Sequence, residues 1–344
     1  MIHLYLGLLL FSFLTTSILV VPYINLLYKL KFQRQNQKTL DFQDKRTPVF
    51  DKFHSQKIGT PVGGGLLIIA SVIILFLSLF PLLRFSNIFI SSNYRIDQEI
   101  AVIFFTFIGF ALLGLYDDVL KFFGFQKTGF FGLRMIHKLL LQLILSILIS
   151  FYVVTQLGIN FVYVPFFGPI DLGWLSVPLY TVIIVAFANF FNISDGLDGL
   201  SCGLLMIALF AFWILSNHSL DTPISLFLAL WLGALIAFLY FNIYPARIWL
   251  GDVGSLSFGA TIALIAILLG KLVPLIVVGA PFIVEGVSSA IQIFSKLYFK
   301  RKVFPAAPIH LTLQKIGWEE PKIVFRAWLA GIILAVVALW LGLN

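Results

Sequence analysis

The stretch Pro223-Ile-Ser-Leu-Phe-Leu-Ala-Leu-Trp-Leu-Gly-Ala-Leu-Ile-Ala-Phe-Leu-Tyr-Phe241 contains 19 residues and no charged side chain. A helix needs about 20 predominantly apolar residues to cross roughly 30 Å of hydrocarbon. Similar runs recur along the 344-residue chain, which is 60% hydrophobic and 11% charged, whereas soluble domains have about 25% charged residues. The runs do not alternate polar and apolar residues as barrel strands do. The sequence therefore predicts an all-α integral membrane protein.

Ten transmembrane helices are expected, at residues 3–23, 62–83, 99–116, 138–156, 175–191, 200–216, 223–241, 254–270, 273–296 and 324–342. No internal repeat and no second, soluble domain is evident, so residues 1–344 are expected to form a single membrane domain. The segment 157–174 combines prolines and glycines with aromatic residues. This composition favours turns or a short hairpin at the membrane interface.

The basic residues predict the orientation of the chain. If the N-terminus is outside, 20 of the 23 Lys and Arg residues lie in or at the edges of the inner loops 24–61, 117–137, 192–199, 242–253 and 297–323. Only Arg84, Arg95 and Lys271 remain on the outer side. Cytoplasmic loops carry such an excess, so both termini are expected outside. The net charge of +8 is explained by the basic residues of these inner loops, so no nucleic acid partner is expected.

Three polar motifs stand at inner ends of the predicted spans. They are Tyr116-Asp117-Asp118, Asn189-Phe-Phe-Asn192-Ile-Ser-Asp195-Gly-Leu-Asp198-Gly-Leu and Gly251-Asp252-Val-Gly-Ser-Leu. Charged groups near a bilayer are costly and usually mark function. Carboxylate oxygens bind Mg²⁺, which commonly takes substrate phosphates as further ligands. We therefore expect a cation-dependent diphosphate site that faces the cytoplasm.

The spacing of the second motif suggests that its side chains act together. Its four polar residues recur every three positions, so they share one side of a helix if the helix continues through residues 189–198. Glycines near Asp252 suit a tight loop whose N–H groups approach a phosphate. Asp117 and Asp118 repel each other unless a cation compensates. A structural alternative is that this pair ends a span in water, near Lys121.

Five further residues are candidates for substrate binding. Trp249 can stack on a planar base and Asn242 can pair with its edge, although Trp is also common at membrane interfaces. Glu285 and Gln292 share one face of the ninth predicted span, where a Glu needs a polar interior or a partner on another helix. His310 lies in the last inner loop, where structural hydrogen bonding is the alternative to a role in binding.

In this order, the three polar motifs resemble those of the polyprenyl-phosphate N-acetylhexosamine-1-phosphate transferases. Within that family, Lys57-Ile-Gly-Thr-Pro, Pro308-Ile-His310 and Lys315-Ile-Gly-Trp318 are most similar to the phospho-N-acetylmuramoyl-pentapeptide transferases. The resemblance implies about ten helices, an active site on the cytoplasmic side of the bacterial inner membrane, and Mg²⁺. It also implies transfer of phospho-N-acetylmuramoyl-pentapeptide from its UDP-activated form to undecaprenyl phosphate, giving lipid I and UMP. The lipid bilayer is a further partner, and a homodimer is an assembly that the resemblance allows.

The resemblance also assigns roles to individual residues. Asp252 and Asn192 match positions that hold Mg²⁺. Asp117 matches the general base on the lipid phosphate, and Asp118 supports it. The residues that match substrate-binding positions of the family are Lys57, Lys138, Asn189, Asp195, Asn242 and Trp249. Trp249 stands in place of the usual phenylalanine under the uracil. The candidates Asp198, Glu285, Gln292 and His310 complete the expected substrate-binding set.

Two departures from the family pattern concern the sugar. His310-Leu311-Thr312 stands where the family has three histidines, and Val62-Gly63 replaces Thr-Met in the glycine motif. An enzyme that uses UDP-N-acetylglucosamine is therefore the first alternative. A transporter, whose acidic groups should lie near the membrane midplane on broken helices, and a binding relative without activity are alternatives of other classes.

Overall fold

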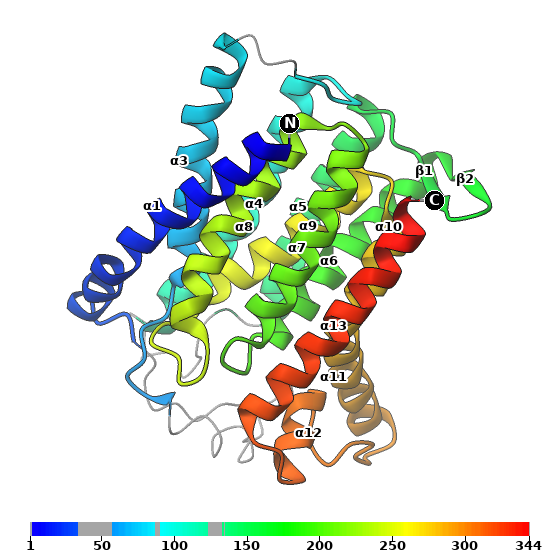
Figure 1. Ribbon diagram of the computed structural model, residues 1–344. Coiled ribbons are helices and arrows are strands. Elements are labelled where there is room, and N and C mark those ends of the chain that lie inside the picture. Colours follow the sequence, from blue (N-terminus) through cyan, green and yellow to red (C-terminus); the bar gives the residue numbers. More distant parts are fainter. Residues whose placement is uncertain (1, 34–56, 87–89, 123–132, 134, 344) are drawn as a thin grey trace.

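The computed structural model describes residues 2–33, 57–86, 90–122, 133 and 135–343, and these are almost entirely helical (Figure 1). The helices are α1 (Ile2–Lys29), α3 (Gly64–Phe85), α4 (Ile96–Phe122), α5 (Met135–Gln156), η3 (Gly173–Leu175), α6 (Ser176–Ser194), α7 (Leu200–His218), α8 (Thr222–Asn242), α9 (Asp252–Leu268), α10 (Leu272–Val278), α11 (Ala280–Tyr298), α12 (Ile309–Lys315) and α13 (Glu320–Leu343). Large parts of the first two predicted inner loops, at 34–56 and 123–132, lie outside the described residues. The predicted helical class is confirmed.

All ten predicted spans coincide with helices, but they do not all have the length of a crossing. Within the described residues, eight helices are long and apolar enough to span a membrane, and a ninth crossing results if α10 and α11 are taken together. Helix α9 coincides with the eighth predicted span and has only 17 residues. The expected number of crossings is therefore confirmed in part.

The ninth predicted span, 273–296, is wrong as a straight helix. Its two parts, α10 and α11, meet at an angle of 73°. The break falls at Gly279, and Pro281 follows in the first turn of α11. Proline has no N–H group for the carbonyl oxygen four residues earlier, so it interrupts a preceding helix but fits the start of a new one.

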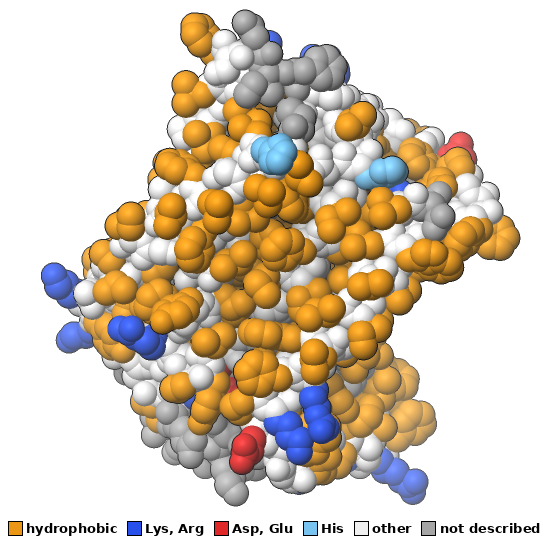
Figure 2. Space-filling model, in the orientation of Figure 1, with side chains coloured by type: hydrophobic (Ala, Val, Ile, Leu, Met, Phe, Trp, Pro, Cys, Tyr) orange, Lys and Arg blue, Asp and Glu red, His pale blue; other side chains and the backbone are white. Residues whose placement is uncertain are grey.

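Both chain ends lie towards the end of the bundle that carries the hairpin of β1 (Phe161–Val164) and β2 (Gly168–Asp171), whereas α12 lies at the opposite end (Figure 1). The antiparallel pairing of the strands confirms the hairpin expected within residues 157–174. On the face shown in Figure 2, hydrophobic side chains cover the middle of the bundle, and more of the visible Lys and Arg side chains lie in its lower half, towards the α12 end, than at the other end. Exposed residues such as Ile18 (73%) and Ile333 (67%) form a broad apolar surface, as expected for contact with lipid.

The core contains an aromatic cluster between α4, α8 and α9. The ring centroids of Phe107, Trp231 and Phe258 lie 5.4, 5.9 and 5.1 Å apart in pairs, and all three side chains are buried. Such pairs contribute about 0.5–1.5 kcal/mol each beyond the area that they bury. Helix α9, buried from Val253 to Leu268, is thus fixed at the centre of the bundle.

Two glycines let neighbouring helices approach the start of α9. A Cβ atom at Gly114 of α4 would overlap with the carbonyl group of Asp252, and one at Gly65 of α3 would overlap with the α9 backbone. Small residues permit such close approach between membrane helices. The contact at Gly114 places the last turns of α4, which carry Asp117 and Asp118, against the first turn of α9.

We expect Gly114→Ala to lower the unfolding temperature in detergent, because the added methyl group pushes α4 away from α9. Overpacking of this kind costs about 1–3 kcal/mol. Gly7→Ala in α1 is the matched control, since nothing lies within 4 Å of the position of its Cβ atom. Equal unfolding temperatures for the two variants would contradict this role of Gly114.

Candidate active site

Residues from α4, α5 and α9 form a charged group that we call the acidic cluster: Asp117, Asp118, Lys121, Lys138 and Asp252. Lys121 Nζ lies 2.9 Å from Asp117 Oδ2 and 2.7 Å from Asp252 Oδ2. Lys138 Nζ lies 3.0 Å from the same Asp117 oxygen and also contacts Asp252 Oδ2. Two ammonium groups therefore bridge two carboxylates and compensate the repulsion between them.

Groups at the start of α9 orient this cluster. Asp252 is the first residue of α9, where the helix dipole favours negative charge. The Val253 N–H donates to Asp118 Oδ2 at 3.0 Å, and Asn192 Nδ2 donates to Asp252 Oδ1 at 3.1 Å. Gly251 has a φ of +80°, which glycine adopts without strain. A turn at Gly251 thus precedes Asp252 as predicted, whereas Gly254 lies inside α9, and the approach of N–H groups to a phosphate stays a prediction.

The helix does not continue through residues 189–198, so the condition for the four polar side chains to share one face is not met, and the predicted inner loop 192–199 begins about one helical turn late. Helix α6 ends at Ser194, and Asp195 follows as its C-terminal cap. The next helix begins only after Gly199, whose φ is +77°. Left-handed glycines commonly separate helices in this way. Asp198 consequently lies in a turn, away from the face that carries Asn192.

The polar residues of this motif contact different partners. Asn189 Nδ2 donates to Gln142 Oε1 of α5 at 2.5 Å, whereas Asn192 reaches the acidic cluster. Asp195 Oδ1 accepts a hydrogen bond from Ser201 Oγ at 2.5 Å. Burial raises the pKa of Asp195 to about 7, and the hydrogen bond from Ser201 opposes this shift.

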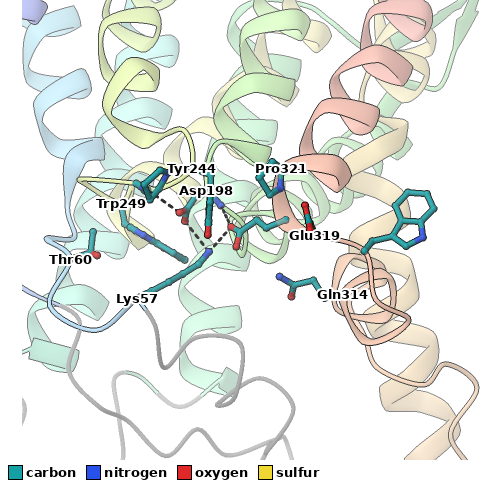
Figure 3. Close-up of a pocket in the computed structure, with 12 residues that line it drawn as sticks. Lys57, Thr60, Asp198, Tyr244, Trp249, Gln314, Glu319 and Pro321 are labelled. Atoms are coloured by element: carbon teal, nitrogen blue, oxygen red, sulfur yellow. Dashed lines mark hydrogen bonds and ion pairs between the residues drawn. The ribbon is translucent and has the colours of Figure 1, made fainter.

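A cavity of about 730 Å³ lies near the acidic cluster, and we call it the tryptophan pocket (Figure 3). Its lining includes Lys57, Thr60, Asp198, Tyr244, Trp249, Gln314 and Glu320. Lys57 Nζ donates to Asp198 Oδ1 at 2.9 Å and lies 4.8 Å from the centroid of the Trp249 ring. Because Asp252 is only three residues after Trp249, their Cα atoms lie at most about 11 Å apart. One ligand can therefore reach both the pocket and the cluster.

Asn242 supports the loop that carries Trp249. Its side chain is buried, and Nδ2 donates to the Ile248 carbonyl oxygen at 3.0 Å. Its Oδ1 has no hydrogen-bond partner within the described part of the chain. The predicted pairing of Asn242 with a base edge stays a prediction.

Glu285 and His310 form a buried pair, with His310 Nδ1 2.9 Å from Glu285 Oε2. A Cβ atom at Gly196 would lie 2.6 Å from His310 Nε2, so the other side of the ring faces the turn between α6 and α7. Gln292 Oε1 accepts from the N–H groups of residues 303–304 at 3.0 and 2.9 Å. Glu285 and His310 thus meet near the site, whereas Gln292 holds the loop after α11.

Two residues of the site are not among those predicted from the sequence. Lys121 lies four residues after Asp117, and this spacing of one helical turn is a signal for an ion pair. Glu320 contacts Lys57 and Asp198 across 263 and 122 residues of sequence. No local pattern indicates a contact over such a separation.

Comparison with known proteins identifies relatives of this chain. Residues 100–270 match the model of glycosyl transferase family 4. The chain is 33% identical over 337 residues to the phospho-N-acetylmuramoyl-pentapeptide-transferase of Halalkalibacterium halodurans, covering 97% of this chain and 96% of the relative. It is 32% identical over 298 residues to the transferase of that name from Bacillus subtilis, covering 84% and 86%. This chain belongs to the phospho-N-acetylmuramoyl-pentapeptide transferase family. The family resemblance inferred from the motifs is confirmed, and the protein is a multi-pass membrane transferase.

In this transferase, thermal stability should fall as the pH rises from about 4 to about 7 and then level off. The folded pKa of Asp195, about 7, lies above the value of about 3.9 for an unfolded Asp. Between these two values the folded state holds a proton that the unfolded state has released, so stability declines across this range, and the decline ends once the folded carboxyl ionises. We expect Asp195→Asn to flatten the dependence of unfolding temperature on pH between mildly acidic and mildly alkaline buffers.

Ser201→Ala is the companion variant, since it removes the hydrogen bond that lowers the pKa of Asp195. The pH at which stability declines should then shift upwards. An Asp195→Asn protein with the same pH dependence as the wild type would contradict the assignment.

Proposed function

We propose that this protein transfers phospho-N-acetylmuramoyl-pentapeptide from its UDP-activated form to undecaprenyl phosphate, giving lipid I and UMP in peptidoglycan synthesis. Similarity over nearly the whole chain to transferases of that name supports this activity. The observation that carries the proposal is the double lysine bridge between Asp117 and Asp252, close to a pocket with an aromatic wall. The two lysines suit a diphosphate, and the aromatic wall of the pocket suits a nucleobase.

The uracil base is proposed to enter the tryptophan pocket and stack on Trp249. Lys57 Nζ lies over that ring, 4.8 Å from its centroid, and pairs with the Asp198 carboxylate. The diphosphate then extends towards Lys121 and Lys138, whose ammonium groups neutralise developing negative charge. Phosphoryl transfer depends mainly on such positioning and charge compensation.

The chemical step is proposed as direct attack. A phosphate oxygen of the lipid forms a bond to the β-phosphorus, while the bond from that phosphorus to the UMP oxygen breaks. The second pKa of a phosphate monoester is about 6, so the nucleophile is mostly ionised near neutral pH. Asp117 then mainly orients the nucleophile, and general-base assistance adds less than the usual 10²–10⁴-fold. A phosphorylated enzyme intermediate that forms and decays fast enough, detected by rapid-quench labelling, would favour a two-step route instead.

The residues around Asp252 fit Mg²⁺ by their donor type. Asp252 and the Asn192 side-chain amide supply oxygen donors, which Mg²⁺ prefers. Among the described residues, no group of three or more His, Cys, Asp or Glu side chains forms a metal cage. Mg²⁺ commonly uses only one or two carboxylates and keeps waters and substrate phosphates. When bound, the ion would neutralise charge on the diphosphate.

We also propose that the α12 end of the bundle faces the cytoplasm. The predicted excess of Lys and Arg in the inner loops supports this orientation, and both termini lie towards the other end (Figure 1). The site then opens where the nucleotide substrate is made. The homodimer stays a prediction.

A sibling activity with UDP-N-acetylglucosamine is the second candidate. It is favoured by Leu311 and Thr312, which stand where the family has histidines. Leu311 is buried, and the Thr312 hydroxyl contacts the Ala306 carbonyl group, so neither replaces an imidazole. UMP release from purified protein with Mg²⁺ and undecaprenyl phosphate should be measured with each UDP-sugar. Release of UMP with UDP-N-acetylglucosamine but not with the UDP-muramoyl-pentapeptide would overturn the function proposed first.

We expect Asp252→Asn to lower UMP release by at least about 10²-fold, as loss of a transition-state electrostatic contact typically does. Asp97→Asn is the matched control, because its carboxylate is 69% exposed and, within the described part of the chain, pairs only with the exposed Arg95. The control should retain wild-type turnover. A binding relative without activity, or a transporter, predicts no UMP release from any of the three proteins.

A further inference from the structure

Glu320 contacts two residues of the tryptophan pocket at once, Lys57 and Asp198. It is the first residue of α13. Glu320 Oε1 lies 2.5 Å from Lys57 Nζ and accepts a hydrogen bond from the Asp198 backbone N–H at 2.6 Å. One carboxylate oxygen therefore joins the segment before α3, the turn between α6 and α7, and the start of α13.

These contacts are shielded from solvent. The side chains of Lys57, Asp198 and Glu320 are only 10%, 4% and 9% exposed. Charge-assisted hydrogen bonds contribute more than neutral ones, and removal of one partner from a buried ion pair leaves the other charge uncompensated. The geometry at Lys57 therefore depends on both carboxylates.

The contact to Asp198 fixes the orientation of that side chain. Its Oδ1 accepts from Lys57, its Oδ2 accepts from the Ala246 N–H at 2.9 Å, and its backbone N–H is held by Glu320. The three groups Lys57, Asp198 and Glu320 together carry a net charge of −1. A neutral base with N–H donors suits this part of the pocket better than a phosphate does.

We infer that Glu320 is a positioning residue for nucleotide recognition: it holds Lys57 and the Asp198 turn in the arrangement that binds the base of the UDP-sugar. This inference rests on the proposed transferase function. It assigns Glu320 no part in the chemical step, because its carboxylate contacts the pocket and not the acidic cluster.

The test compares KM for the UDP-sugar, kcat and the affinity for UMP among variants of the full-length protein. Glu320→Gln keeps the size of the side chain but removes its charge. Loss of a charge-assisted hydrogen bond predicts a KM and a Kd for UMP about tenfold higher or more, with kcat changed less than threefold. Glu320→Asp, which keeps the charge on a shorter side chain, should recover part of the affinity.

Glu319→Gln is the matched control, since it removes a neighbouring carboxylate that also lines the tryptophan pocket but has no partner among the described residues. It should raise KM clearly less than Glu320→Gln does. In the double variant Lys57→Met/Glu320→Gln, the effects on affinity should be less than additive, because both substitutions break the same ion pair.

Unchanged KM and UMP affinity in Glu320→Gln would overturn the inference. A lower kcat together with a lower unfolding temperature, without a selective change in KM, would also overturn it, since this result would indicate a purely structural role. If the wild type released no UMP with either UDP-sugar, the proposed function would be wrong. The calorimetric affinity of the variants for UMP would then still decide the role of Glu320.

Discussion

Carboxylates that are packed together away from water must be matched by cations, and this constraint governs the site. Asp117 and Asp252 each offer an oxygen to both Lys121 and Lys138. Without the lysines, burial would favour protonation of the carboxylates. With them, carboxylates and ammonium groups can stay ionised together at a place where, in the proposed function, a diphosphate binds. A phosphate can replace a carboxylate as the partner of an ammonium group, so the same contacts that stabilise the free enzyme can serve its substrate.

The helices make this cluster possible by close packing rather than by loop structure. Gly114 brings α4 onto the first turn of α9, and the buried aromatic core holds α9 in place. The cluster therefore sits where the C-terminal part of α4 meets the N-terminus of α9, a point at which the helix dipole favours Asp252. Residues 249–252 extend from this point to the tryptophan pocket. In the proposed function, this short segment joins the site of base recognition to the site of phosphate chemistry.

The sequence predicts the elements that depend on local composition. Apolar runs indicate the helices, and the acidic residues at their ends indicate the cluster. The end of α6 is predicted only approximately, at residue 191 instead of Ser194, because the polar residues that follow do not mark a sharp helix end. The bend at Gly279 is similarly hidden within a continuous apolar run. Contacts such as that of Glu320 with Lys57 depend on tertiary packing, and one sequence alone does not reveal them. The residue roles beyond these contacts stay predictions.

The most direct test of the central claim is a double-mutant cycle between Lys138 and Asp252 that uses the rate of UMP release. If the lysine acts through one shared cluster, Lys138→Met should reduce the rate strongly in the wild type and much less in the Asp252→Asn protein. The coupling energy should exceed about 0.5 kcal/mol, the scale on which additivity fails for residues in contact. Additive effects of the two substitutions would show that the lysine and the carboxylate act independently, and would contradict the account.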